Sequence, residues 1–174
     1  MTRTRLASRT ATDTSVTRRN VPGGRTRLVA IRIDASTPAL VTAVQAALAA
    51  EGLPNSDLTE ADRAFYAYMT DRSTLAGFAG LQLAGEHALI RSVVVLPGHR
   101  GRGLVLQIVP HMVSCARNLG ATHAWLLTDN ARPLFERLGF TAVDTDVVPA
   151  ALVRTSTYRT LRTRKAVPMM MVLV

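Results

Sequence analysis

The chain of 174 residues contains one cysteine, few aromatic residues and no long apolar segment. Because Cys115 is alone, no internal disulfide can form, and its place in a helical pattern predicts a buried thiol. The lack of an apolar run of 18 residues predicts that no helix spans a membrane. A chain with 48% apolar and 19% charged residues is typical of a single globular domain. Together these features predict a domain in a reducing, cytoplasmic setting.

Acidic residues are also scarce, since 12 of them face 21 basic residues and leave a net charge of +9. Most of this charge is N-terminal, where residues 1–27 hold seven arginines and a single aspartate. Residues 1–24 carry almost no large apolar side chain, so we expect a disordered basic extension there, or an early start codon, and a folded domain over residues 25–174. Nucleic-acid binding by the extension is a less favoured alternative, because the remaining chain is only mildly basic.

The spacing of apolar residues changes along the chain between the periods of strands and helices, which predicts a mixed α/β domain. Pro38 and Gly52 frame the first helix, and Pro110 predicts a kink in the second. We expect strands at 27–33, 64–69, 74–83, 89–96, 123–127 and 167–174, helices at 38–52, 104–120, 131–139 and 147–161, and a short helical turn at 59–62.

The most informative stretch is an apolar, β-branched strand at 89–96, followed by a loop at 97–103 and a helix. Two glycines alternate with two arginines in this loop. Backbone N–H groups at a helix start attract anions, glycines let a phosphate approach closely, and guanidinium groups add charged donors. The stretch therefore predicts a loop that binds a phosphate-bearing ligand. Two other phosphate loops are excluded, because no Gly-Lys-Ser/Thr follows and no third glycine completes G-x-G-x-x-G.

The strand and loop follow the pattern V-x-V-x-P and then R-x-x-G-x-[G/A], with Val105 in place of the last small residue. This pattern resembles the acyl-CoA-binding core motif of the GNAT superfamily of N-acetyltransferases. The resemblance implies a mixed α/β fold, with a mostly antiparallel sheet between helices and with acetyl-CoA as co-substrate. It also implies that the strand backbone pairs with the pantetheine arm and that the loop amides hold the pyrophosphate. The implied residues are Val93, Val94, Val95, Arg100, Gly101, Arg102, Gly103, Leu104 and Val105.

A second stretch, 128–140, is similar to another GNAT signature, N-x-x-A-x-x-L-Y-x-x-x-G-F. Thr128 stands where the family usually has Asn, and Phe135 stands where it usually has Tyr. Both residues are implied to contact the cofactor. In the family this tyrosine commonly protonates the departing CoA thiolate, which phenylalanine cannot do. If the chain is an enzyme, another group or water must supply that proton. The matching residues are Ala131, Leu134, Gly139 and Phe140.

Several longer phrases resemble the arsenic-resistance N-acetyltransferase subfamily of the GNAT superfamily. They cover the chain from about residue 27 to the C-terminus, and in that subfamily Thr128 and Phe135 are the usual residues. The resemblance implies a role in resistance or detoxification. The phrases are EGLP at 51–54, LIRSVVV at 89–95, HRGRGL at 99–104, LLT at 126–128, LFERLGF at 134–140 and VPAALVRTSTYRTL at 148–161.

Acetyl transfer to an amine needs a base for the ammonium and a hydrogen-bond donor for the oxyanion. The donor is expected from a strand amide near residues 93–95. Glu86 lies where the superfamily often has a carboxylate base, although a solvated charge in a turn explains it as well. Arg91 and Ser92 adjoin the acceptor side, and Ser92 is the second candidate catalytic residue beside Glu86. Arg91 binds either an anionic acceptor or a structural ion-pair partner, since a buried guanidinium needs one.

We therefore interpret the chain as an acetyl-CoA-dependent N-acetyltransferase that acts on the amine of a small molecule, as a monomer or a homodimer. One alternative is acetylation of a protein N-terminus or another amine. Another is a GNAT-fold CoA-binding protein with weak or no catalysis, which Val105 and Phe135 favour. His87, His111 and His123 lack the spacing of metal ligands, so no metal site is expected.

Overall fold

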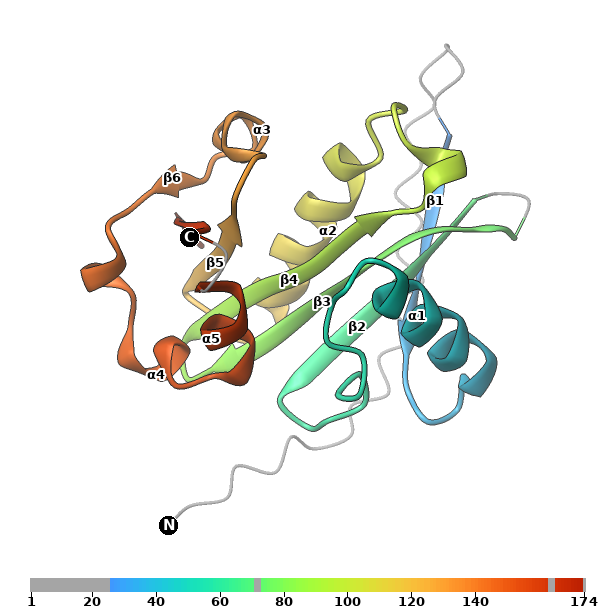
Figure 1. Cartoon of the computed structure of the whole chain (residues 1–174), viewed down its shortest axis with the longest axis horizontal. Coiled ribbons are helices and arrows are strands. Elements are labelled where there is room, and N and C mark those ends of the chain that lie inside the picture. The colour runs from blue at the N-terminus through green and yellow to red at the C-terminus, as the bar shows by residue number, and fades with distance from the viewer. Residues whose placement is uncertain (1–25, 71–72, 163–164, 174) are drawn as a thin grey trace.

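The computed structural model describes residues 26–70, 73–162 and 165–173. These residues form one seven-stranded sheet in the order β1-β2-β3-β4-β5-β7-β6, with helices on both of its faces (Figure 1). Residues 1–24, expected to be a disordered extension, lie outside the described residues. The elements are β1 (Leu28–Ile33), α1 (Pro38–Ala50), β2 (Arg63–Thr70), β3 (Leu75–Ala84), β4 (His87–Val95), the 3₁₀ turn η1 (Pro97–His99), α2 (Val105–Asn118), β5 (His123–Thr128), α3 (Arg132–Arg137), β6 (Thr141–Ala142), the 3₁₀ turn η2 (Thr145–Val147), α4 (Ala150–Val153), α5 (Ser156–Arg162) and β7 (Val167–Val172).

The expected mixed α/β fold with a mostly antiparallel sheet is confirmed. Strands β1 to β4 form an antiparallel meander, β4 and β5 run parallel, and β7 pairs antiparallel with both β5 and β6. Helix α2 packs on one face through apolar side chains one turn apart, such as Ile108 and Met112. Helix α1 covers the other face through Val44 and Leu48.

Three local expectations are corrected by the structure. Residues 59–62 form a turn rather than a helical turn, because β2 already begins at Arg63. The helix expected over 147–161 is divided into α4 and α5. The hydroxyl of Thr155 accepts a hydrogen bond from the N–H of Tyr158 at 3.1 Å and so starts α5 as a new helix. The short strand β6 was not expected from the sequence, since two residues leave no period to detect.

The feature that positions the site is a separation between the parallel strands β4 and β5. Within the described residues, only the segment 87–89 of β4 pairs with β5, opposite residues 123–125. Beyond these residues the two strands diverge (Figure 1). A bulge in β4 accompanies this divergence. Arg91 lies opposite Gly80 and Val94 opposite Phe78, so β4 carries an extra residue. Ser92, at the bulge, has a left-handed φ of 54°.

Candidate active site

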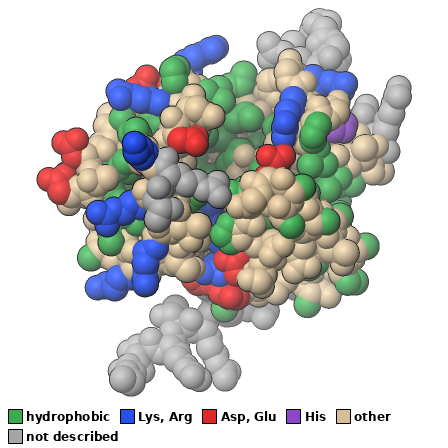
Figure 2. Space-filling model, viewed as in Figure 1, with side chains coloured by type: hydrophobic (Ala, Val, Ile, Leu, Met, Phe, Trp, Pro, Cys, Tyr) green, Lys and Arg blue, Asp and Glu red, His purple; other side chains and the backbone are tan. Residues whose placement is uncertain are grey.

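A cavity of about 300 Å³ occupies the space between the diverging strands. Its walls come from β4, β5 and α3, with Leu53 after α1 and Leu161 of α5 on the side of the sheet that α1 covers. A second cavity of about 420 Å³ lies beside the loop that follows β4. Val93, Val105 and Leu134 line both cavities, so the two are adjoining parts of one site. Figure 2 shows a hollow with hydrophobic side chains in this region of the surface.

The loop after β4 presents its backbone to the second cavity. Gly101 and Gly103 have φ values of 75° and 67°, which favour glycine and turn the chain into α2. No group among the described residues accepts a hydrogen bond from the N–H groups of residues 101–105. Five N–H groups at the start of a helix form an anion site, which fits the pyrophosphate expected here. The loop residues Gly101, Gly103, Leu104 and Val105 all line this cavity.

The two loop arginines are placed differently. Arg100 donates from Nε to the carbonyl of Val95 at 2.9 Å and from Nη2 to Glu51 at 2.7 Å. Arg100 therefore fastens the loop to the end of β4 and to the end of α1. Arg102 is exposed and forms no ion pair within the described part of the chain. Of the two, Arg100 lines the second cavity, whereas Arg102 keeps a charge that no ion pair with the described residues compensates.

Val105, Thr128 and Phe135, which the resemblance implied as cofactor contacts, all line the first cavity. Val105 is half-buried between the two cavities, where a small residue would leave more room. Thr128 Oγ1 accepts a hydrogen bond from the N–H of Ala131 at 3.0 Å and shapes the turn before α3. The Phe135 ring packs edge-on against Phe140, with 6.1 Å between ring centroids. The hydroxyl groups in the first cavity, among described residues, belong to Ser92 and Thr128.

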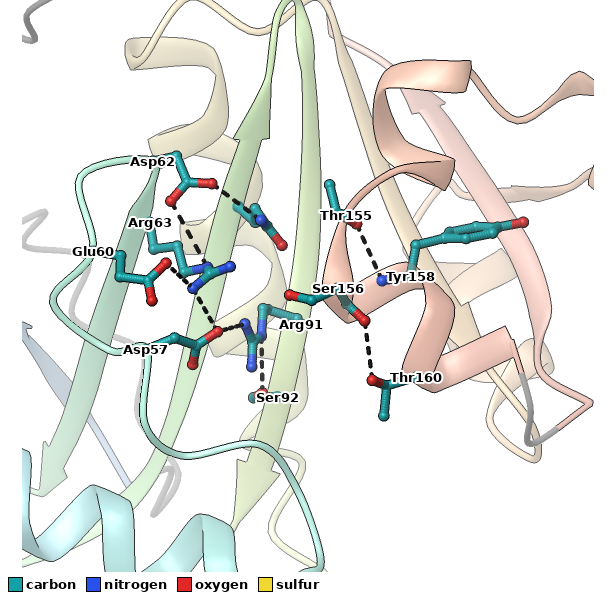
Figure 3. Close-up of polar contacts among 11 residues, drawn as sticks. Asp57, Glu60, Asp62, Arg63, Arg91, Ser92, Thr155, Ser156, Tyr158 and Thr160 are labelled. Atoms are coloured by element: carbon teal, nitrogen blue, oxygen red, sulfur yellow. Dashed lines mark hydrogen bonds and ion pairs between the residues drawn. The ribbon is translucent and has the colours of Figure 1, made fainter.

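Arg91 and Ser92 are brought to the wall of the first cavity. Arg91 is buried, and its Nη1 donates to Asp57 Oδ2 at 2.6 Å while its Nε lies 3.4 Å from Ser92 Oγ (Figure 3). Its guanidinium also lies 5.3 Å from the centre of the Phe65 ring. Asp57 is shared, because Arg63 Nη1 contacts the same oxygen at 2.7 Å. Arg91 thus has the structural ion-pair partner that a buried guanidinium needs.

Glu86 is the candidate base that the structure does not bring to either cavity. It lies in the turn before β4 and accepts a hydrogen bond from Thr122 Oγ1 at 3.1 Å. Ser92 lies six residues further along the chain, a span of about 20 Å at the rise of a β-strand. It lines neither cavity. A carboxylate so placed cannot take a proton from an amine between β4 and β5.

The sequence reasoning missed Asp57 and Asp129. Asp57 follows α1 in a loop, and nothing local in the sequence indicates that it meets Arg91. Asp129 directly follows β5 and is the one carboxylate that the described residues contribute to the first cavity. A signal for Asp129 existed, because polar residues at the carboxyl ends of parallel strands commonly form ligand sites.

Residues 26–70, 73–162 and 165–173 contain no helix long and apolar enough to cross a membrane. In the same residues, no three His, Cys, Asp or Glu side chains are grouped so that they could hold a metal ion.

Comparison with known proteins gives relatives of one kind. Streptothricin acetyltransferase of Streptomyces lavendulae is 33% identical over 97 residues, which are 52% of this chain and 51% of that protein. The chain thus spans about half the length of this curated relative. N-acetylglutamate synthase of Neisseria gonorrhoeae, solved with coenzyme A and N-acetyl-glutamate, has a TM-score of 0.68 at 19% identity, over 87% of this chain and 36% of that chain. An aminoglycoside 6'-N-acetyltransferase solved with coenzyme A has a TM-score of 0.63 at 15% identity, over 84% and 97% of the two chains. The model of the acetyltransferase (GNAT) family matches residues 34–140, more than half of the chain, so the chain belongs to that family.

Proposed function

We propose that the protein is an N-acetyltransferase that transfers the acetyl group of acetyl-CoA to the amine of a small molecule. The observation that carries this proposal is the continuity of the two cavities. One lies between β4 and β5, and the other lies beside five backbone N–H groups for which the described residues provide no acceptor. An extended thioester with a pyrophosphate at one end matches this shape. The family relatives solved with coenzyme A support the same ligand.

The residues divide the task of binding acetyl-CoA. The N–H groups of residues 101–105 and the guanidinium of Arg102 would hold the pyrophosphate, while Arg100 keeps the loop in place. The backbone of Val93, Val94 and Val95 would pair with the pantetheine arm, with Thr128 and Phe135 forming the opposite wall. When bound, acetyl-CoA supplies an electrophilic thioester carbonyl. Ser92 and Val93 have no partner on β3, which gives the bulge backbone freedom to meet a ligand.

Proton transfer in this site depends on few groups. Asp129 would accept the proton that the acceptor ammonium must lose, directly or through water. Phe135 cannot protonate the departing thiolate, so the proton would come from water in the cavity or through the hydroxyl of Ser92.

We also propose a cellular role for the enzyme, which the family alone does not define. The enzyme would acetylate a toxic amine, as a resistance enzyme does, and its site suits compact acceptors. The similarity to streptothricin acetyltransferase supports this role. The similarity to the arsenic-resistance subfamily, a cytoplasmic location and a homodimer stay predictions. Acetylation of protein N-termini stays an alternative acceptor class. A CoA-binding protein with weak catalysis is the second candidate, because Val105 narrows the junction and Phe135 offers no proton.

Calorimetric titration with acetyl-CoA and with desulfo-CoA, alongside a thiol-release assay with a panel of amines, tests the proposal. We expect micromolar binding of both ligands and release of CoA only when an acceptor amine is present. Arg102→Ala should weaken binding about 3- to 10-fold, because it removes one exposed charged contact. Arg117→Ala, which removes an exposed arginine from the last turn of α2, is the matched control. Binding without turnover on any amine would favour the second candidate, and no binding at millimolar ligand would overturn both.

A further inference from the structure

The segment EGLP at 51–54 follows α1 and borders both cavities. Glu51 lines the second cavity, and Leu53 lines the first. Among the described residues that line the second cavity, Glu51 is the one acidic residue. A carboxylate is unexpected in a cavity whose backbone N–H groups favour an anion, because two negative charges repel each other there. Its place in the cavity therefore indicates a function of its own.

The end of α1 fixes the backbone from which the Glu51 side chain extends. The N–H of Glu51 donates to the carbonyls of Ala47 and Leu48 at 3.2 and 3.1 Å. The N–H of Leu53 donates to the carbonyl of Leu48 at 2.9 Å and closes the helix. Gly52 has a φ of 66°, which turns the chain out of the helix between these bonds. The carboxylate is thus presented to the cavity by a well-defined helix end.

Arg100 is held in a way that leaves part of its guanidinium exchangeable. Its Nε donates to the carbonyl of Val95 at 2.9 Å, which keeps the group at the end of β4. Its Nη2 donates to Glu51 Oε1 at 2.7 Å. Both side chains of this ion pair are exposed, 53% for Arg100 and 37% for Glu51, and exposed ion pairs are weak. An anion of higher charge in the cavity can therefore replace the carboxylate on Arg100.

We propose that Glu51 controls the release of CoA, because its carboxylate competes with the pyrophosphate for Arg100. This inference rests on the proposed function and concerns the same cofactor site. In the free protein the carboxylate neutralises Arg100. A pyrophosphate that enters the cavity takes the guanidinium and displaces the carboxylate towards solvent. When CoA leaves, Glu51 pairs with Arg100 again, and no covalent bond changes in this exchange.

The value of such a competitor follows from the chemistry of the two ligands. CoA keeps every phosphate group of acetyl-CoA, so contacts with the pyrophosphate hold the product as tightly as the substrate. Binding energy that is the same throughout the reaction does not raise kcat, and product release limits the turnover of many enzymes. A carboxylate that reclaims Arg100 weakens both ligands equally. It thereby shortens the time for which CoA blocks the site.

Glu51→Gln in the full-length protein tests the competition. Calorimetric titration with CoA and with acetyl-CoA should give Kd values about 3- to 10-fold lower than those of the unchanged protein, because Arg100 no longer has an anionic partner to give up. Stopped-flow displacement of a CoA labelled on its thiol with a fluorophore should show dissociation slowed by a similar factor. If Glu51 only supported the loop, this variant would instead bind CoA more weakly, which would overturn the proposal.

Glu136→Gln is the matched control. Glu136 accepts a hydrogen bond from Arg132 Nε at 2.7 Å, and the two side chains are 45% and 57% exposed. Neither residue lines the cavities. This variant loses the same charge and a similar ion pair, so its Kd for CoA should stay within about twofold of that of the unchanged protein. An equal gain in both variants would show a general effect of net charge and would refute the role of Glu51.

Two further ligands locate the effect on CoA. 3′-Dephospho-CoA keeps the pyrophosphate and should show the full gain in Glu51→Gln, whereas acetyl-pantetheine, which has no phosphate, should show none. A gain that required the 3′-phosphate would refute competition with the pyrophosphate. In an Arg100→Gln background, Glu51→Gln should lose most of its effect on the Kd. An undiminished gain there would show that Glu51 does not act through Arg100.

Failure of this inference and failure of the proposed function give different results. Binding of CoA by the unchanged protein, with no gain in Glu51→Gln, would refute the competition while the cofactor site stands. Absence of CoA binding by both proteins at millimolar ligand would refute the function itself.

Discussion

Gly77 of β3 offers the sharpest test of how the bulge in β4 is held. A Cβ built at this glycine would lie 2.4 Å from the carbonyl oxygen of Val94, a backbone atom that no rotamer change can move. Gly77→Ala therefore forces β3 and β4 apart at the residues that follow the bulge. Overpacking of this kind costs about 1–3 kcal/mol, and a backbone contact belongs in the upper half of that range. For a domain of this size, about 2–3 kcal/mol lowers the melting temperature by about 4–12 °C.

The same substitution should weaken acetyl-CoA binding, because Val94 and Val95 line the second cavity. The assay is thermal unfolding with and without acetyl-CoA, together with calorimetric titration. Gly98→Ala in η1 is the control, since nothing lies within 4 Å of its added Cβ. We expect that variant to melt within about 2 °C of the unchanged protein, as surface substitutions do. If Gly77→Ala melted with its control, the close approach of β3 to Val94 could not be what holds the bulge.

Three further predictions concern other parts of the chain. Gly103→Ala should raise the Kd for acetyl-CoA about 5-fold or more. Its φ of 67° costs an L side chain about 1–2 kcal/mol, and the strain falls on the loop amides. The control Gly120→Ala, with a φ of 88° at the end of α2, should lose similar stability and keep its affinity for acetyl-CoA. Burial, with smaller contributions from Cys115 and Tyr66, raises the pKa of Tyr68 above its ordinary 10.0, so stability should be complete below pH 10 and fall as the pH rises beyond it. Tyr68→Phe should remove that alkaline slope in urea unfolding, even though it loses the 2.9 Å contact with His111. Burial and His123 lower the pKa of His87 below 6.5 against the opposing effect of Glu86. The contribution of His87 to stability should therefore be complete above pH 6.5 and fall as the pH drops below it. A His87→Gln variant whose stability fell equally steeply with acid pH would contradict this assignment.

The loop after β4 could be predicted from the sequence because its determinants are local. A β-branched run, two glycines and a helical period lie within one continuous stretch, and the structure places β4, the loop and α2 there. The cofactor contacts proposed at residues 93–95 and 100–105 belong to this same stretch, so their positions follow from its local pattern. The helix starting at Pro38 was predictable for the same reason, because proline in the first turn is a local signal.

The acceptor side could not be predicted in the same way, because its determinants are distant in sequence. Asp57 and Arg91 are 34 residues apart, and only the register of β2, β3 and β4 brings them together. A buried arginine in a strand predicts that a partner exists but not which of the chain's acids it is. Glu86 is a different case. Its place in the turn before β4 is a local feature, but no local pattern specifies where along β4 the bulge and the separation from β5 fall.

The separation of β4 from β5 and the ion pair of Arg91 with Asp57 both adjoin the bulge in β4. A serine with a φ of 54° is unfavourable, so the conformation of Ser92 persists only because its neighbours fix the chain on both sides. Arg91 is held by Asp57 on one side, and Val94 is buried opposite Phe78 on the other. The extra residue between these two anchors leaves Ser92 and Val93 outside the described pairing with β3, beyond Leu89, the last residue of β4 that pairs with β5. The buried guanidinium of Arg91 is therefore one of the two anchors of the bulge, which explains why it must keep a partner of its own.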